Sequence, residues 1–197
     1  GPPCGRICAG SPDWREKGGS LPLTMQVTRI LSPQHPLAGE WWQLYEAAFP
    51  ACERRSRAQH AAALQDAAFH CLHLADAAGF AGMLSYWQWP ELCYVEHLAI
   101  AESRRGQGLG HRVLELLPLP FILEIEPVVD AATARRLAFY ESAGLVWLLQ
   151  PHVQLAYQAG QPEVPLWLLS KPALCEADVA RFEQLYHAGP MHYRDGA

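Results

Sequence analysis

Residues 94–110, YVEHLAIAESRRGQGLG, decide the fold, because an apolar segment runs within a few residues into two arginines and three alternating glycines. The apolar half is short and contains β-branched and aromatic side chains, which predicts a buried strand. Glycines allow positive φ angles and let a ligand approach the main chain closely. The next segment, HRVLELLP, has helical spacing. We therefore predict a strand, a glycine-rich loop and the start of a helix. Such a loop is an anion site, and a phosphate is the anion that fits best.

The composition limits the class of protein. With 197 residues, half of them hydrophobic, the chain can bury one good core. A net charge of −5 argues against nucleic acid or an anionic membrane as the main partner. We find no apolar run long enough to cross a bilayer and no signal peptide. The six cysteines have no CxxC pair and no metal-ligand spacing, so we expect reduced thiols, a cytoplasmic protein and no metal site.

The chain divides into three zones by composition. Residues 1–24 are rich in glycine and proline and show no sustained period, so we expect a leader outside the core, with Met25 as a candidate natural start. Residues 25–197 are predicted to form a single domain. Its motif-bearing region spans 94–150, and a C-terminal embellishment covers 145–197.

Hydrophobic patterns place seven strands and five helices in residues 25–197. Strands are expected at 25–31, 69–76, 79–89, 93–101, 121–127, 145–150 and 165–170, and helices at 38–49, 55–66, 109–117, 130–144 and 176–188, with a loop at 151–164. Short links between successive strands favour antiparallel pairs, whereas the strand–helix–strand unit around 94–126 implies a parallel pair. The prediction is one α+β (mixed α/β) domain with a mostly antiparallel, mixed central sheet flanked by helices.

A second motif adds to the first. RRGQGLG fits the pattern of Arg or Gln, two residues, Gly, one residue, then Gly or Ala, with Arg105, Gly108 and Gly110 at the fixed positions. About thirty residues later, LAFYESAGL carries Phe-Tyr-Glu on a helix that ends at Gly144. In this order, with a strand between them, the two motifs resemble the GNAT superfamily of acetyl-CoA-dependent N-acyltransferases. The resemblance covers roughly residues 25–150, and the tail is similar to a subset of uncharacterised bacterial members.

Other phosphate-binding motifs fit less well. A Walker loop needs Gly-Lys-Ser or Gly-Lys-Thr, whereas Gly110 is followed by His111 and Arg112. A dinucleotide-binding fingerprint normally follows the first strand of a parallel array and precedes an acidic residue by about twenty positions. Glu124 and Glu126 lie near that distance, but several antiparallel-type strands precede the loop. Dinucleotide binding is therefore the weaker alternative.

The resemblance implies how acetyl-CoA, the co-substrate, is held. In a GNAT-like fold the parallel strand pair splays apart to admit it. Main-chain N–H groups of the glycine loop would hold the pyrophosphate, and the strand before the loop would pair with the pantetheine amides. The implied binding residues are Leu98, Ala99, Ile100, Arg105, Gly106, Gln107, Gly108, Leu109, Gly110, Thr133 and Tyr140. Thr133 stands where many members have asparagine, and its hydroxyl can still form a hydrogen bond.

The resemblance also implies direct attack of a primary amine on the thioester in a ternary complex. Tyr140 is the expected acid for the leaving thiolate, since a phenol stays protonated at neutral pH. A core tyrosine on an amphipathic helix is the alternative reading.

Three carboxylates on two central strands are candidates for the base. By alternation, Tyr94, Glu96, Leu98 and Ile100 share one face of their strand, and His97 lies on the other. Burial where the strands splay would raise the pKa of such a carboxylate toward that of a useful base. The resemblance implies Glu124 and Glu96 as catalytic positions. The alternatives are ion pairs of Glu96, Glu124 or Glu126 with Arg112, Arg135 or Arg136, His97 as the base, and a water chain.

The acceptor is the least specified part of the prediction. Segments 46–60 and 151–165 would flank its entrance, where Arg54 and Arg55 either bind a substrate carboxylate or are solvated. A small-molecule or peptide amine is expected, with no nucleic acid or membrane partner, and both monomer and homodimer stay open. The glycine loop fits a non-catalytic acyl-CoA sensor equally well, but Tyr140 and the carboxylates favour an enzyme.

Overall fold

The computed structural model describes residues 25–196, so the predictions made for residues 1–24 lie outside the described range. In chain order the elements are β1 (Gln26–Arg29), α1 (Ala38–Ala48), η1 (Ala51–Glu53), α2 (Arg57–Ala63), β2 (Phe69–Asp76), β3 (Gly79–Gln88), β4 (Cys93–Ile100), η2 (Glu102–Arg104), α3 (Leu109–Glu115), β5 (Phe121–Ile125), α4 (Ala131–Ser142), β6 (Val146–Gln154), β7 (Val164–Lys171), α5 (Glu176–Ala188) and η3 (Pro190–Tyr193).

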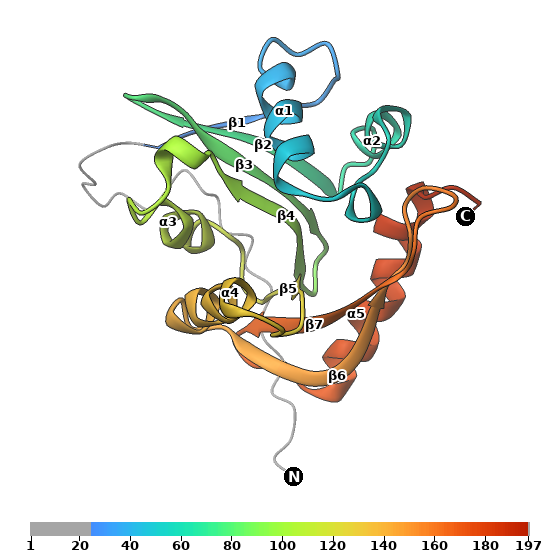
Figure 1. Cartoon of the computed structure of the whole chain (residues 1–197). Coiled ribbons are helices and arrows are strands. Elements are labelled where there is room, and N and C mark those ends of the chain that lie inside the picture. The colour runs from blue at the N-terminus through green and yellow to red at the C-terminus, as the bar shows by residue number, and fades with distance from the viewer. Residues whose placement is uncertain (1–24, 197) are drawn as a thin grey trace.

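The strands form one mixed sheet in the order β1-β2-β3-β4-β5-β7-β6 (Figure 1). Every neighbouring pair is antiparallel except β4 and β5, which are parallel. The predicted fold class is therefore confirmed, including the parallel pair around the glycine loop.

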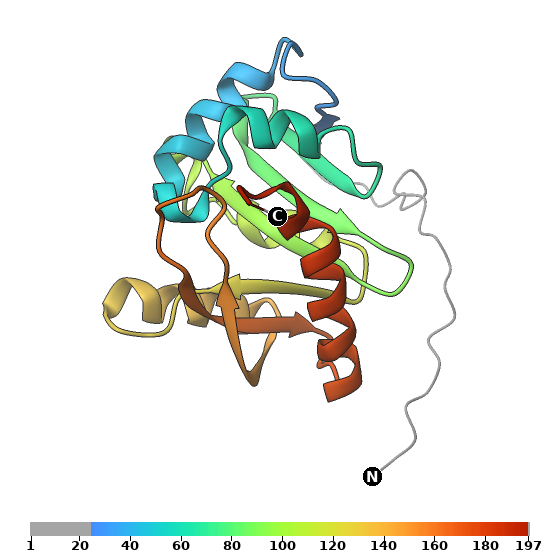
Figure 2. The same ribbon diagram turned by 90° about the vertical axis from the view of Figure 1, so that its right-hand side faces the viewer.

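Helices cover both faces of this sheet (Figures 1 and 2). On one face, α1, α2 and α5 pack through a cluster that includes Trp41, Tyr94 and Phe182. On the other face, α3 and α4 pack through a cluster that includes Val95 and Val113. Because both faces are buried, the central strands are apolar on both sides. Within residues 25–196, no helix is both long and apolar enough to span a membrane.

Strands β4 and β5 are paired only where they begin. Their ladder joins Cys93 with Phe121, Tyr94 with Ile122, and Val95 with Leu123, and goes no further. From Glu96 onward, the edge of β4 that faces β5 therefore has no strand partner. The predicted splay of the parallel pair is present, and it opens toward the glycine loop.

A bulge in β4 changes which side chains share a face. The register with β3 shifts by one residue at Glu96, which has no partner of its own. As a result, Tyr94 and Glu96 contact the side covered by α1 and α5, whereas Leu98 and Ile100 pack with the side covered by α3 and α4. The prediction that these four residues share a face is wrong, because simple alternation does not continue through a bulge.

Strand β6 is longer than predicted. The sequence places a loop from Pro151 onward, yet the strand continues through this proline to Gln154. β6 lies at the edge of the sheet, where a proline without an N–H is tolerated. The pairing with β7 is irregular between Trp147 and Pro151, and Leu149 has a φ of 61°. The extension brings His152 and Gln154 onto the sheet.

Candidate active site

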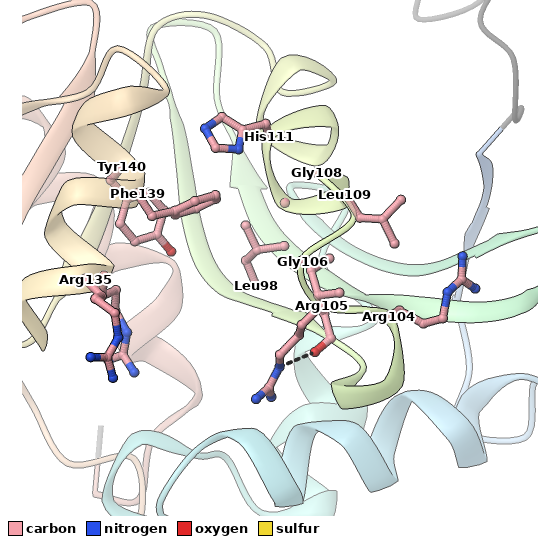
Figure 3. Close-up of a pocket in the computed structure, with 13 residues that line it drawn as sticks. Leu98, Arg104, Arg105, Gly106, Gly108, Leu109, His111, Arg135, Phe139 and Tyr140 are labelled. Carbon is pink, nitrogen blue, oxygen red and sulfur yellow. Dashed lines mark hydrogen bonds between the residues drawn. The ribbon is translucent and has the colours of Figure 1, made fainter. Parts of the chain in front are cut away.

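A cavity of about 600 Å³ lies between the glycine loop, the end of β4 and helix α4 (Figure 3). Leu98 and Ile100 form its floor from β4, and the loop contributes the main chain of Gly106 and Gly108. Phe139 and Tyr140 face them from α4, and Arg135 lies at the open end (Figure 3). The cavity extends from the glycine loop to the end of β4 and α4, so it can hold a chain-like ligand with a phosphate at the loop.

The loop presents donors to that cavity. Gly108 has a φ of 72° immediately before α3, a backbone conformation that favours glycine. In the described range, the main-chain N–H groups of Gly106, Gln107 and Gly108 have no acceptor, which leaves them available to an anion. Arg104 forms an ion pair with Asp76, the last residue of β2, and this pair fixes the loop against the sheet.

Most of the predicted binding residues meet in this cavity. Those that line it are Leu98, Ile100, Arg105, Gly106, Gly108, Leu109, Gly110 and Tyr140. Ala99 lines a second cavity instead, and Gln107 lines neither. Thr133 is placed differently from the prediction. Its hydroxyl accepts the N–H of Asp130 at 3.0 Å in the capping box of α4, so the hydroxyl is already used at the helix start.

The second cavity, of about 450 Å³, adjoins the first and shares five lining residues with it: Leu98, Ile100, Arg105, Arg136 and Tyr140. Its walls are η1 and the end of α1, the splayed parts of β4 and β5, and α4. Four glutamates are among the residues that line it: Glu53, Glu96, Glu124 and Glu126. Tyr140 lines both cavities, so a group bound in one can reach a group bound in the other at this side chain.

The Tyr140 hydroxyl has no hydrogen-bond partner within residues 25–196. Burial raises the pKa of Tyr140, and the nearby Arg136 guanidinium opposes that rise only in part. The phenol is therefore neutral at physiological pH and can donate a hydrogen bond at the junction of the two cavities. This position and protonation state suit the predicted acid.

The Glu96 carboxylate is not free to act as a base, because its oxygens already have partners. Its side chain is fully buried and forms an ion pair with Arg55 at 2.5 Å. The Tyr157 hydroxyl and the Trp87 indole N–H also donate to this carboxylate, at 2.6 and 3.0 Å. Burial alone would raise the pKa of Glu96, but Arg55 outweighs burial and lowers the pKa to about 2. The expectation of a raised pKa at Glu96 is wrong, because a buried cation that the sequence did not reveal lies beside it.

Arg55 is also placed differently from the prediction that it is solvated or binds a substrate carboxylate. It is 2% exposed, stacks over the Tyr157 ring, and donates to the Pro190 carbonyl at 2.8 Å. It therefore joins the sheet, the β6–β7 loop and the C-terminal segment, and it is neither solvated nor available to a substrate carboxylate.

Glu96→Gln is expected to destabilise the protein by about 3 kcal/mol, because it leaves the buried Arg55 charge without its partner. The wild-type contribution is present above the ordinary pKa of a glutamate and is lost as the pH falls toward about 2. Urea unfolding at pH 7 and at pH 3 measures both effects, and the two proteins should differ less at pH 3. Equal stability at pH 7 would contradict a structural role for the pair.

Glu124 is also held by donors, but it borders the second cavity. The Tyr94 hydroxyl donates to it at 2.6 Å, and His152 forms an ion pair with its other oxygen. His152 is in turn 2.8 Å from Glu183 on α5. Burial would lower the pKa of His152, but the two carboxylates raise it to about 9, so this imidazole is a cation at neutral pH.

The remaining candidates have structural partners. Glu126 forms an ion pair with Arg136, as one of the alternatives predicted. His97 has its Nε2 2.8 Å from the Glu53 carbonyl and its Nδ1 3.3 Å from Ser85 Oγ. Burial lowers the pKa of His97, so this side chain is a neutral, fully engaged residue of the core.

Sequence reasoning missed Glu53 and His152. Glu53 follows a proline in a connection with no periodic pattern, and His152 lies in the stretch predicted as a loop. The alternation of His152 and Gln154 across Val153 was a signal for a strand, but Pro151 concealed it.

Comparison with known proteins agrees with this geometry. Residues 35–117 match the profile of the Acetyltransferase (GNAT) family. This part of the chain is therefore similar to GNAT-family acetyltransferases. The chain is 30% identical over 108 residues to the candidate acetyltransferase YjbC of Bacillus subtilis (strain 168), a match that covers 51% of this chain and 54% of that protein. The chain thus spans about half the length of this curated relative.

Solved structures show the same GNAT fold. A candidate GNAT-family acetyltransferase from Bacteroides thetaiotaomicron superposes with a TM-score of 0.75 at 25% identity, over 82% of this chain and 96% of that one. A Bacillus subtilis acetyltransferase solved in complex with CoA has a TM-score of 0.51 at 14% identity, over 78% of this chain and all of that one.

Proposed function

We propose that this protein transfers the acetyl group of acetyl-CoA to a primary amine by direct attack in a ternary complex. The observation that carries the proposal is the position of Tyr140. Its unpartnered hydroxyl lies where a cavity bordered by the glycine loop meets a cavity bordered by carboxylates. One cavity suits a phosphate-bearing chain, and the other suits a cationic amine.

The residues of the first cavity fit acetyl-CoA, which supplies a thioester carbonyl and a thiolate leaving group when bound. The free N–H groups from Gly106 to Gly108 would donate to the pyrophosphate, and Arg135 would add positive charge at the open end. The unpaired edge of β4 from Glu96 onward offers main-chain groups to the pantetheine amides in the manner of an added strand.

The residues at the junction would supply the acid–base chemistry. The Tyr140 phenol donates toward the sulfur as negative charge develops there. Of the two carboxylates predicted to act as base, Glu124 alone keeps a place on the acceptor cavity without a direct arginine partner. Its negative charge would attract the ammonium form of the acceptor.

Acetyl-CoA and CoA are expected to raise the melting temperature, because a ligand that binds only the folded state stabilises it by mass action, by about 2.7 kcal/mol at a hundred times its Kd. Differential scanning fluorimetry over CoA thioesters measures this shift. Mass spectrometry of a panel of primary amines incubated with acetyl-CoA then tests turnover. No shift at millimolar acetyl-CoA would contradict the proposal, and a shift without acetylation of any amine would indicate an acyl-CoA sensor.

A further inference from the structure

Four glutamates line the second cavity, which we call the acceptor cavity. Three of them already have strong partners. Glu96 is paired with Arg55, Glu126 with Arg136, and Glu124 with His152 and the Tyr94 hydroxyl. Glu53 is the exception. Within residues 25–196, its carboxylate has neither a hydrogen bond nor an ion pair.

Glu53 is nevertheless held firmly in place. It ends η1, and its main-chain carbonyl accepts the Nε2–H of His97 at 2.8 Å, which fastens this turn to the bulged part of β4. His97 is itself fixed through Ser85 and by edge-on contact with Phe49. The backbone of Glu53 is thus anchored to the sheet while its carboxylate is left without a partner.

The charged and titratable groups around Glu53 are known from each neighbouring element. Arg136 and Tyr140 lie on α4, Glu124 and Glu126 on β5, Glu96 and His97 on β4, and Arg105 in the glycine loop. Burial raises the pKa of Glu53, the Arg136 charge opposes the rise, and the Glu124 charge adds to it. A half-buried carboxylate without a partner is costly, so a cation that enters the cavity would be bound beside it.

A second unpartnered group lies on the same cavity. Gln154 on β6 is 4% exposed, and its Nε2 has no hydrogen-bond partner in the described part of the chain. Unpaired buried polar groups on the wall of a cavity point to a polar ligand that completes them. The cavity therefore has unmet hydrogen-bonding capacity in two places, on η1 and on β6.

The two carboxylates that face the acceptor have opposite environments. Glu124 has the His152 cation and the Tyr94 hydroxyl as partners, whereas Glu53 has no such partner and sits in surroundings that favour its protonated form. Pairs of titratable groups whose environments differ in this way commonly divide acid–base roles.

We propose that Glu53 is a catalytic residue that removes the proton from the acceptor amine, while Glu124 binds the ammonium without taking its proton. The inference rests on the proposed acetyl transfer, and it specifies the acceptor as a primary amine that enters as its cation. One N–H bond of the ammonium breaks, and an O–H bond forms on Glu53. The electron pair left on nitrogen then forms the new bond to the thioester carbon, and the C–S bond breaks with its electron pair going to sulfur. The leaving thiolate would take the Tyr140 proton, and the second N–H proton, released as the amide forms, would return to Tyr140. Glu53 returns the proton to water after product release.

The decisive experiment compares Glu53→Gln with Glu124→Gln and with Glu46→Gln. Glu46 is an exposed control on α1, seven residues before Glu53, and its recorded ion pair is a 3.7 Å contact with Arg54. Initial rates are measured from pH 6 to 10 with whichever of ethanolamine, putrescine, tyramine and glycinamide the wild type acetylates. We expect Glu53→Gln to lose roughly 100-fold in kcat at pH 7 and to recover most of it by pH 10, where the free amine needs no base. Glu124→Gln should instead raise the KM for the amine with a smaller change in kcat, and Glu46→Gln should match wild type.

Stability provides a readout that a merely structural role would not produce. Because the pKa of Glu53 is raised in the folded state, its ionisation lowers stability as the pH rises through that pKa. Glu53→Gln should therefore melt about 2 °C above wild type at pH 8, and the difference should vanish near pH 4. A variant that melts lower than wild type at pH 8 would overturn the inference.

The kinetic outcomes separate this inference from the proposed function. If wild type acetylates an amine and Glu53→Gln stays within threefold of it at every pH, the assignment of Glu53 is overturned and acetyl transfer stands. If Glu124→Gln alone loses kcat at pH 7 and recovers at high pH, the inference is also overturned. Glu124 would then be the residue that removes the amine proton. If wild type acetylates none of the four amines although acetyl-CoA raises its melting temperature, both proposals fall.

Discussion

Gly108→Val is expected to abolish acetyl-CoA binding while the protein stays folded. Gly108 has a φ of 72°, a conformation that a β-branched side chain adopts only with strain of roughly 1–3 kcal/mol. A Cβ at this position would meet no protein atom within 4 Å, so the substitution does not clash with the core. Relief of the strain would turn the loop N–H groups away from the cavity, and the new methyl groups would occupy the ligand's approach. Loss of the acetyl-CoA thermal shift, with an intact cooperative melt, is the expected result.

Gly160→Val is the matched control for this variant. Gly160 lies in the β6–β7 loop with a φ of 81°, and a Cβ there would also meet no atom within 4 Å. It carries the same backbone strain far from the glycine loop in sequence and outside both cavities. Gly160→Val should lower stability by a similar amount and bind acetyl-CoA normally. Normal binding by Gly108→Val would show that this loop is not the phosphate site.

The parts of the fold that sequence predicted well are those with local signals. The β4–loop–α3 unit combines a short apolar strand, closely spaced glycines and a helical repeat within 25 residues of chain. Helix α4 begins after Asp130, whose side chain accepts the N–H groups of Ala132 and Thr133, and it ends before Gly144 with a φ of 85°. In both places the local backbone geometry favours particular residue types, such as glycine at positive φ. The sequence alone was therefore sufficient to predict these elements.

The charge partners of the site could not be predicted, because they depend on contacts between distant segments. Arg55 meets Glu96 across 41 positions, and the same guanidinium reaches Pro190. Glu53 and Arg55 are two residues apart in one acidic and basic run, yet one faces the acceptor cavity and the other is buried in the core. The sequence cannot show which of the two side chains is buried, because their burial depends on how η1 and α2 pack on the sheet.

The bulge at Glu96 shows why the assignment of a base from strand alternation failed. Alternation placed Glu96 with Leu98 on the cofactor side, whereas the extra residue turns the carboxylate toward Arg55 and leaves Leu98 on the cavity. The same irregularity helps to part β4 from β5, because pairing with β5 stops at the residue before it. A feature that opens the cavity therefore also commits the Glu96 carboxylate to Arg55, although Glu96 still borders the second cavity.

Tyr140→Phe is expected to separate binding from chemistry. The ring would still pack on α4 beside Phe139, and the lost hydroxyl has no protein partner within residues 25–196, so stability should change by less than about 1 kcal/mol. If the phenol protonates the leaving thiolate, kcat should fall by roughly 10- to 1000-fold at a nearly constant KM for acetyl-CoA. Steady-state kinetics with any amine that the wild type acetylates measures this effect.

The pH dependence distinguishes Tyr140 from a carboxylate base. A variant that lacks the base recovers as the pH rises, because more of the amine is then unprotonated. Tyr140→Phe should show no such recovery, since the missing proton is needed on the sulfur at every pH. Tyr86→Phe removes a hydroxyl from a half-buried tyrosine on β3, outside both cavities, and should leave kcat unchanged. Equal turnover by Tyr140→Phe and wild type would make Tyr140 a packing residue of α4 and would leave the departing thiolate to be protonated by water at the junction of the two cavities.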